Sequence, residues 1–274
     1  MKVYQKTINY KYDGEKFKLI CFSDVHIGSA NCAMDDFREM LKRHGKKPNT
    51  YLIDIGDACD FVSPHDKRYR VSAIHPLFRE QDSLIDAQID YYCKEIETYV
   101  DRDKFLGIVS GNHHDSILKY YSTDPTQRIA ERLGIYNLGY CFFYRLLFKR
   151  KGKGHQTLLL YGHHGYGGGS RTEGYNLTKF ARNTSFIDAD ILLYGHTHDK
   201  WGKRLIRVTE RNGKVQEIPM VVANCGTFLR TLTKNEVPSY SEAKGFPPRD
   251  IGYVIVEITT PTEEKPFFDL RVML

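Results

Sequence analysis

No stretch of this sequence approaches the run of roughly 18 apolar residues that a membrane-spanning helix requires. The N-terminal residues, MKVYQKTINYKYDGEKF, lack the apolar segment of a secretory signal peptide. Neither an internal repeat nor a low-complexity tract is present. These absences predict a cytoplasmic protein with no membrane partner.

The cysteines also lack any pattern, since no Cys-x-x-Cys pair occurs among the six. Disulfide frameworks and zinc ribbons both depend on characteristic cysteine spacings. We therefore predict six buried thiols, at Cys21, Cys32, Cys59, Cys93, Cys141 and Cys225.

Positive charge is in only slight excess. The formal net charge of +6 favours an anionic substrate but lies far below that of a nucleic-acid packaging protein. A hydrophobic content of 41% is ordinary for a globular protein. We predict one domain over residues 1–274, in which 61–101 is either a helical cap over the active-site edge or a long helix behind a loop.

Short apolar runs end abruptly in clusters of Asp, His, Asn and Gly. These runs are 17–22, 51–55, 105–109, 157–161, 191–194 and 220–223. Each is too short for a helix and has the composition of a strand buried on both faces.

The remaining segments predict an α/β protein. Helical periodicity covers 35–44, 76–101 and 125–133, with Pro125 suited to a helix start. Later strand-like runs cover 140–149, 203–209, 215–220, 252–258 and 267–273, with an Asn-Gly turn at 211–214. Two packed sheets with helices outside accommodate this order.

Acidic motifs follow the first two strands. Asp24 and His26 stand two residues apart, where both side chains can turn toward one ion. Gly56 permits a turn that places the Asp57 carboxylate between two cations. We expect Asp60 to orient a neighbouring loop or helix. Each motif alone is more often a turn or a helix N-cap.

Three later strand ends supply neutral ligands. Asn112 offers an amide oxygen, and His113 beside it offers an imidazole that can reach a substrate oxygen. Further histidines occur in Gly162-His163-His164-Gly165 and Gly195-His196-Thr197-His198. A buried imidazole must find hydrogen-bond partners for both nitrogens, so paired histidines at strand ends would be costly as core residues. Five such clusters in order predict a metal site.

The order D-x-H, G-D-x-x-D, G-N-H, H-G and G-H-x-H resembles that of the calcineurin-like metallophosphoesterase superfamily. The resemblance runs from Asp24 to His198 and on to Asn224-Cys225-Gly226-Thr227. It implies a four-layer αββα sandwich of two mixed sheets flanked by helices. It also implies a first metal held by Asp24, His26 and His198, a bridging Asp57, and a second metal completed by Asn112, His164 and His196, with His163 as the alternative to His164.

The implied activity is that of a dinuclear metal-dependent phosphoesterase with Asp57 and His113 as catalytic residues. The two cations lower the pKa of a bridging water that attacks phosphorus. The resemblance assigns His113 to the transferring phosphoryl group or the leaving oxygen. Oxygen and nitrogen ligands without thiolate suit manganese first, then iron, zinc or magnesium.

One departure concerns the neighbour of His113. The family usually has an acidic residue directly after this histidine, whereas this chain has His114 and then Asp115. Either Asp115 takes the orienting role, or His113 is held less firmly in position.

The loop after His164 reads H-G-x-G-G-G-x-R-T-x-G and resembles that of phage and prophage members of the superfamily. We predict that Arg171 binds a non-scissile phosphate and that Asn112 also contacts substrate. The alternative for Arg171 is an exposed arginine in a flexible glycine loop.

The substrate is predicted to be a phosphodiester in DNA, RNA or a nucleotide. The basic balance, the family's exonuclease branch and several tyrosines that can stack on bases favour it. These tyrosines are Tyr91, Tyr92, Tyr120, Tyr121 and Tyr166. A phosphomonoesterase or protein phosphatase is the alternative, and a non-catalytic metal-binding module is a second one. The resemblance is also compatible with a homodimer.

Overall fold

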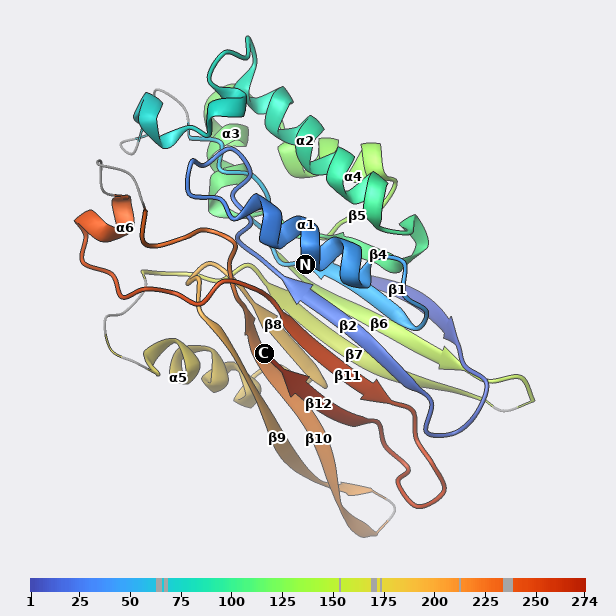
Figure 1. Cartoon of the computed structure of the whole chain (residues 1–274). Helices are drawn as coiled ribbons and strands as arrows, with labels where there is room; N and C mark the ends of the chain where they lie inside the picture. The colour runs from blue at the N-terminus through green and yellow to red at the C-terminus, as the bar shows by residue number, and fades with distance from the viewer. Residues whose placement is uncertain are drawn as a thin grey trace.

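Two mixed sheets of six strands each pack face to face, with helices on their outer faces (Figure 1). The computed structural model describes residues 1–62, 66, 69–152, 154–168, 172, 174–211, 213–233 and 239–274. The predicted α/β sandwich of two mixed sheets flanked by helices is confirmed.

The first sheet has the strand order β12-β11-β2-β3-β4-β5. Its strands are β2 (Lys16–Phe22), β3 (Thr50–Asp54), β4 (Phe105–Ile108), β5 (Tyr136–Asn137), β11 (Val254–Thr259) and β12 (Asp269–Met273). Strands β2 to β5 are parallel, whereas β11 and β12 are antiparallel to their neighbours. The parallel strands therefore end at the same edge.

The second sheet has the order β1-β6-β7-β8-β10-β9. Its strands are β1 (Lys2–Asn9), β6 (Cys141–Lys149), β7 (His155–His163), β8 (Ile191–Tyr194), β9 (Lys200–Arg211) and β10 (Lys214–Cys225). Strands β7, β8 and β10 are parallel, so their carboxyl ends also share one edge. Arg211 pairs with Lys214, as a two-residue hairpin turn requires; Asn212 of the predicted turn lies outside the described residues.

The helices begin and end where local chemistry favours it. They are α1 (Met34–His44), α2 (Leu84–Tyr99), α3 (Asn112–Tyr121), α4 (Pro125–Leu133), α5 (Tyr175–Ala181) and α6 (Tyr240–Ala243). The predicted helix at 76–101 is shorter in the structure. Pro76–Phe78 forms a separate 3₁₀ turn, and the Ser83 side chain accepts a hydrogen bond from Asp86 N to start α2. Asp124 caps α4 in the same way.

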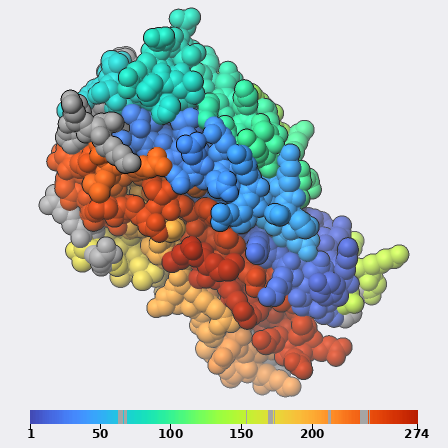
Figure 2. All heavy atoms as spheres, in the orientation of Figure 1, coloured from blue at the N-terminus to red at the C-terminus, as the bar shows by residue number. Residues whose placement is uncertain are grey.

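The two sheets enclose one hydrophobic core, and a second core lies between the first sheet and the helices α1, α2 and α4. Phe37 of α1 and Tyr92 of α2 stack in this second core with ring centroids 6.0 Å apart. In the space-filling view the α2 region lies directly against α1 (Figure 2). The outer face of the second sheet is covered by α5.

Residues 71–78 lie beside the loop that follows β2, because Ala73 O accepts from Ala30 N and Gly28 O accepts from His75 N. Helix α2 belongs instead to the outer layer. A cap over the active-site edge stays a prediction for 61–101, of which 63–65, 67 and 68 lie outside the described residues.

None of the six cysteines forms a disulfide, and all except the half-buried Cys141 are buried. The described residues include no helix both long and apolar enough to cross a bilayer.

His44 makes stability depend on pH. Burial, aided by the charges of Arg43 and Lys18, lowers the pKa of this imidazole to about 4, and its Nε2 lies 2.8 Å from Tyr253 Oη. Between pH 6.5 and 4 the unfolded chain takes up a proton that the folded chain does not, so stability falls as pH falls.

Between pH 7 and 5 we expect wild-type protein to lose about 1 kcal/mol more unfolding free energy than His44→Gln, after allowance for solvent around the ring. Urea unfolding at the two pH values measures this difference. The exposed His155→Gln variant serves as the control and should follow the wild type. Parallel losses in the wild type and His44→Gln would contradict the assignment.

Candidate metal centre

The predicted motif residues converge where the carboxyl ends of β2, β3 and β4 meet those of β7 and β8. Each group is delivered by the loop directly after its strand, or by the first turn of α3 in the case of Asn112 and His113. Backbone bonds link the loops, because Asp24 N donates to Gly56 O and Gly195 N donates to His164 O. Among the described residues, three groups of side chains could each hold a metal ion. Two of them contain the predicted ligands, and the third joins His26 to Asp60 and His113.

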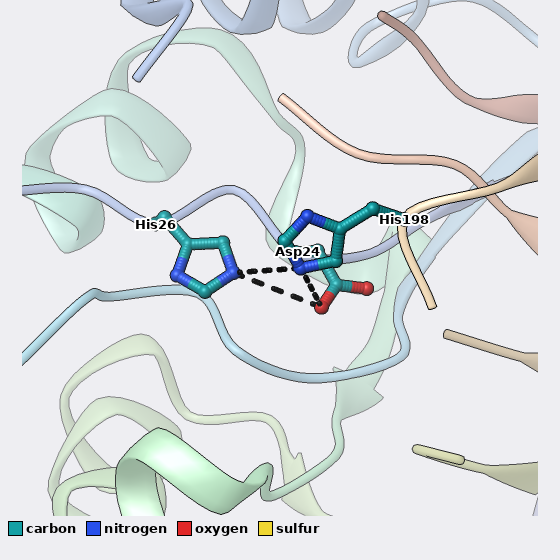
Figure 3. Close-up of side chains that lie close together, drawn as sticks. All are labelled: Asp24, His26 and His198. Carbon is teal, nitrogen blue, oxygen red and sulfur yellow. Dashed lines mark hydrogen bonds and ion pairs between the residues drawn. The ribbon is translucent and has the colours of Figure 1, made fainter. Parts of the chain in front are cut away.

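The first group consists of Asp24, His26 and His198 (Figure 3). The Nε2 atoms of the two histidines lie 3.3 Å apart. Asp24 Oδ1 lies 3.3 Å from Nε2 of His198 and 3.8 Å from Nε2 of His26. Three potential ligand atoms thus face one point.

Asp24 is fixed through its other oxygen. Oδ2 accepts hydrogen bonds from Ser23 Oγ at 2.6 Å and from His196 N at 2.8 Å. Oδ1 is buried and has no hydrogen-bond partner among the described residues. A buried carboxylate oxygen without a donor is costly unless a cation meets it. The donor set therefore fits a metal ion.

The second group consists of Asp57, His164 and His196, with Asn112 beside it. His164 Nε2 lies 3.2 Å from Asp57 Oδ2 and 3.4 Å from Asn112 Oδ1. His164 Nδ1 donates to Ile55 O at 2.8 Å, which leaves the Nε2 lone pair directed at the group.

His163 faces another environment. Its Nδ1 accepts a hydrogen bond from Gly165 N at 2.8 Å, and its ring packs against Tyr140 and Tyr166. The structure therefore places His164, and not His163, beside Asp57. Neighbouring residues of a strand point to opposite faces, so only one of the pair can reach the site.

Asp57 belongs to the second group and also interacts electrostatically with His26 of the first. Burial would raise the pKa of its carboxyl, but the charges of His164, His113 and His26 hold it far below its usual range. Burial likewise opposes the low pKa of Asp24, which His198 and His26 maintain. Both carboxylates are therefore anionic in a buried site, and the field they create favours cations.

The histidines respond to this field. Burial would lower the pKa of His164, but the charge of Asp57 raises it to about 9. The nearby carboxylates of Asp24 and Asp60 overcome the burial of His26 and raise its pKa to about 10. The ring nitrogens of these histidines can thus bind either a proton or a metal ion.

Asp60 holds two histidines. Its Oδ1 lies 3.0 Å from Nδ1 of His26, and its carbonyl oxygen accepts from Nδ1 of His113. The sequence suggested an orienting role for Asp60 but not its partners. Asp115 instead accepts from Ser110 Oγ at 2.9 Å, so Asp60, rather than Asp115, contacts His113.

His114 belongs to the core. Its Nδ1 lies 2.8 Å from Thr126 Oγ1, and its Nε2 accepts from Cys59 N at 3.5 Å. Burial lowers its pKa to about 3, so the ring is neutral and ties α3 to α4 and to the loop after β3. His114, which stands where the family usually has an acidic residue, therefore packs in the core and does not orient His113.

Backbone strain is concentrated in the site. Most of the described non-glycine residues with positive φ belong to the predicted ligand set, namely Asp24, His26, Asp57, His196 and His198. Such a conformation costs on the order of 1 kcal/mol per residue and clusters at functional sites. Gly111 is required for another reason, because a Cβ there would lie 2.0 Å from Asp57 Oδ1.

The tyrosines predicted to stack on bases differ in burial and in position. Tyr92 is buried and donates to Asp54 Oδ2 at 2.6 Å, and Tyr91 accepts from Arg38 at 2.7 Å. Tyr120 and Tyr121 are exposed but end a helix that begins at Asn112, roughly 13 Å away. Tyr166 is exposed in the loop directly after His164. Arg171 lies outside the described residues.

The sequence matches the family described as Calcineurin-like phosphoesterase over residues 17–200, and the chain belongs to this family. No curated protein matches the chain. Solved structures are similar to the chain at low identity. A predicted phosphoesterase from Streptococcus pneumoniae TIGR4 is 13% identical, with 94% of this chain and 99% of that chain covered and a TM-score of 0.34. Vps29 from Chaetomium thermophilum is 14% identical, with 94% and 96% covered and a TM-score of 0.35.

The NAD nucleotidase of Haemophilus influenzae is also similar in structure. It is 9% identical, with 96% of this chain and 50% of that chain covered and a TM-score of 0.42. The family membership identifies the chain as a metallophosphoesterase, and its Asp and His groups are suited to a dinuclear metal site.

An Asp60→Asn variant tests the role of Asp60 as a positioning residue. We expect kcat on a phosphoester substrate to fall about 10- to 100-fold, because His26 loses its orienting carboxylate, whereas the contact of His113 with the Asp60 carbonyl oxygen is retained. The pH profile of kcat should shift as well, since Asp60 raises the pKa of His26. Steady-state kinetics from pH 5 to 9 measure both effects. An unchanged pH profile would show that Asp60 only supports the fold.

Proposed function

We propose that the chain is a dinuclear metal-dependent phosphodiesterase that acts on nucleic acid or a nucleotide. Asp24, His26 and His198 would hold one divalent cation, and Asp57 would contact both. The second cation would be held by Asn112, His164 and His196. Manganese is our first choice, because the ligands are oxygens and imidazole nitrogens without a thiolate.

The single observation that carries this proposal is Asp24 Oδ1. It is buried, has no hydrogen-bond donor among the described residues, and lies within 4 Å of two imidazole nitrogens. A core aspartate would pair both oxygens with donors. This arrangement is what a cation ligand requires.

Two divalent cations, when bound, supply charge that neutralises phosphoryl oxygens and lowers the pKa of water. The chain's residues orient the substrate around them. The contact with the Asp60 carbonyl assigns the His113 proton to Nδ1, so Nε2 is the nitrogen that can approach a phosphoryl or leaving oxygen. Asn112, which is exposed, would meet substrate as well as metal.

The net charge of the chain and an exposed aromatic side chain favour a diester over a monoester as the substrate. The net charge of +6 attracts a polyanion, and an exposed tyrosine follows the ligand His164. A monoesterase or protein phosphatase would use the same ligands, so the substrate class must be measured.

Purified protein supplied with manganese should be assayed on bis-p-nitrophenyl phosphate, p-nitrophenyl phosphate and linear single-stranded DNA. Faster turnover of the first and third supports the proposal. Preference for the monoester identifies a phosphatase. Bound manganese, measured by mass spectrometry, without turnover of any substrate identifies a non-catalytic metal-binding module.

A further inference from the structure

The loop directly after His164 carries an exposed aromatic ring. Tyr166 follows His164 by two residues, and Gly167 O accepts a hydrogen bond from Nε2 of His196 at 2.9 Å. The ring is therefore on a segment that contacts one proposed ligand and directly continues from another. Tyr166 is 45% exposed.

Several contacts hold this ring in place. Lys179 of α5 donates to the Tyr166 carbonyl, and its ammonium lies over the ring, 4.7 Å from the centroid. Phe180 and His163 make near-perpendicular contacts with the ring at centroid distances of 5.6 and 5.8 Å. An exposed ring with so many contacts is preorganised, and preorganisation reduces the entropy lost when a ligand stacks on it.

The ring remains accessible to a ligand. Lys179 lies over it, yet almost half of the residue is open to solvent. The ammonium is half-buried, and desolvation lowers its pKa, so it remains close to the ring rather than extending into water. A planar ligand group could therefore stack on the exposed part of the ring.

We propose that Tyr166 is a specificity-determining residue that stacks on the nucleobase attached to the scissile phosphate. This inference rests on the proposed function and names the part of the substrate that lies outside the metal centre. A nucleobase lies one sugar away from its phosphate, and base stacking on an aromatic side chain tolerates any base sequence. Substrates without a planar group would gain nothing from Tyr166.

Two substrates with the same leaving group isolate this contribution. They are thymidine 5′-p-nitrophenyl phosphate and methyl p-nitrophenyl phosphate. We expect Tyr166→Leu to reduce the preference in kcat/KM for the thymidine ester about tenfold, mainly through KM. Tyr166→Phe should keep the preference, because the ring and not the hydroxyl stacks. Tyr12→Leu removes a more exposed tyrosine, 58% exposed, from the turn between β1 and β2, and should behave as wild type.

A binding measurement separates this inference from the proposed reaction. Calorimetric titration of the manganese-loaded protein with thymidine 5′-monophosphate should show about tenfold weaker binding to Tyr166→Leu, whereas binding of methyl phosphate should not change. If neither ester is hydrolysed but this difference is seen, the reaction is wrong and the stacking is right. Equal affinities of wild type and Tyr166→Leu for the nucleotide would overturn the inference.

Discussion

An Asp57→Asn enzyme is expected to lose about 10³-fold or more in kcat/KM while it keeps its fold. Asparagine preserves the size of the side chain, and its Oδ1 can still accept the hydrogen bond that His113 N gives at 3.1 Å. The variant lacks the negative charge that holds positive charge on His164 and also interacts with His26. Both metal affinity and turnover should therefore fall.

The measurements are kcat/KM on bis-p-nitrophenyl phosphate, manganese content by mass spectrometry, and circular dichroism for the fold. Asp35→Asn is the matched control, since its side chain is 95% exposed in the first turn of α1 and belongs to none of the groups that could hold a metal ion. A folded Asp57→Asn protein with activity within tenfold of the wild type would remove Asp57 from the centre.

The second large effect is expected for His113→Asn, with a fall in kcat of about 10²- to 10⁴-fold. His113 belongs to neither of the two proposed ligand groups, and its Nδ1 is engaged by Asp60. The manganese content of this variant should therefore equal that of the wild type. Loss of metal along with activity would instead make His113 a ligand.

The leaving group distinguishes the two roles of His113. If the imidazole protonates the leaving oxygen, the loss should be small for p-nitrophenolate, which needs no proton, and large for the alkoxide released from a dinucleoside monophosphate. Equal losses on both substrates would assign His113 to the phosphoryl oxygens. A loss below tenfold on both would contradict either role.

The sheets were predictable because their strands are short apolar runs that end in polar clusters. Strand β8 was predicted at its observed bounds, and most others within a few residues. Helix α3 was missed, because Asn112, His113 and Asp115 are weak helix formers and resembled a loop. Strand β1 was missed as well. Most of its residues are exposed or half-buried, so its apolar pattern is weak.

The sequence predicted that the candidate ligands follow strand ends, but it did not predict how their side chains are arranged. The sequence left His163 and His164 as alternatives, since only the pairing of β7 decides which of two consecutive residues faces Asp57. The contact of Asp60 with His113 joins residues 53 positions apart and depends on how α3 packs. The acidic neighbour expected beside His113 comes from a different loop, because His114 is committed to the core.

The left-handed backbone of Asp24, His26, Asp57, His196 and His198 has a consequence for how this chain can be altered. Glycine is the residue that this conformation accommodates without steric cost. Folding alone would therefore favour glycine at all these positions. Stability and function therefore favour different residues at these positions. Substitutions chosen only to raise the melting temperature would remove the side chains proposed to bind metal.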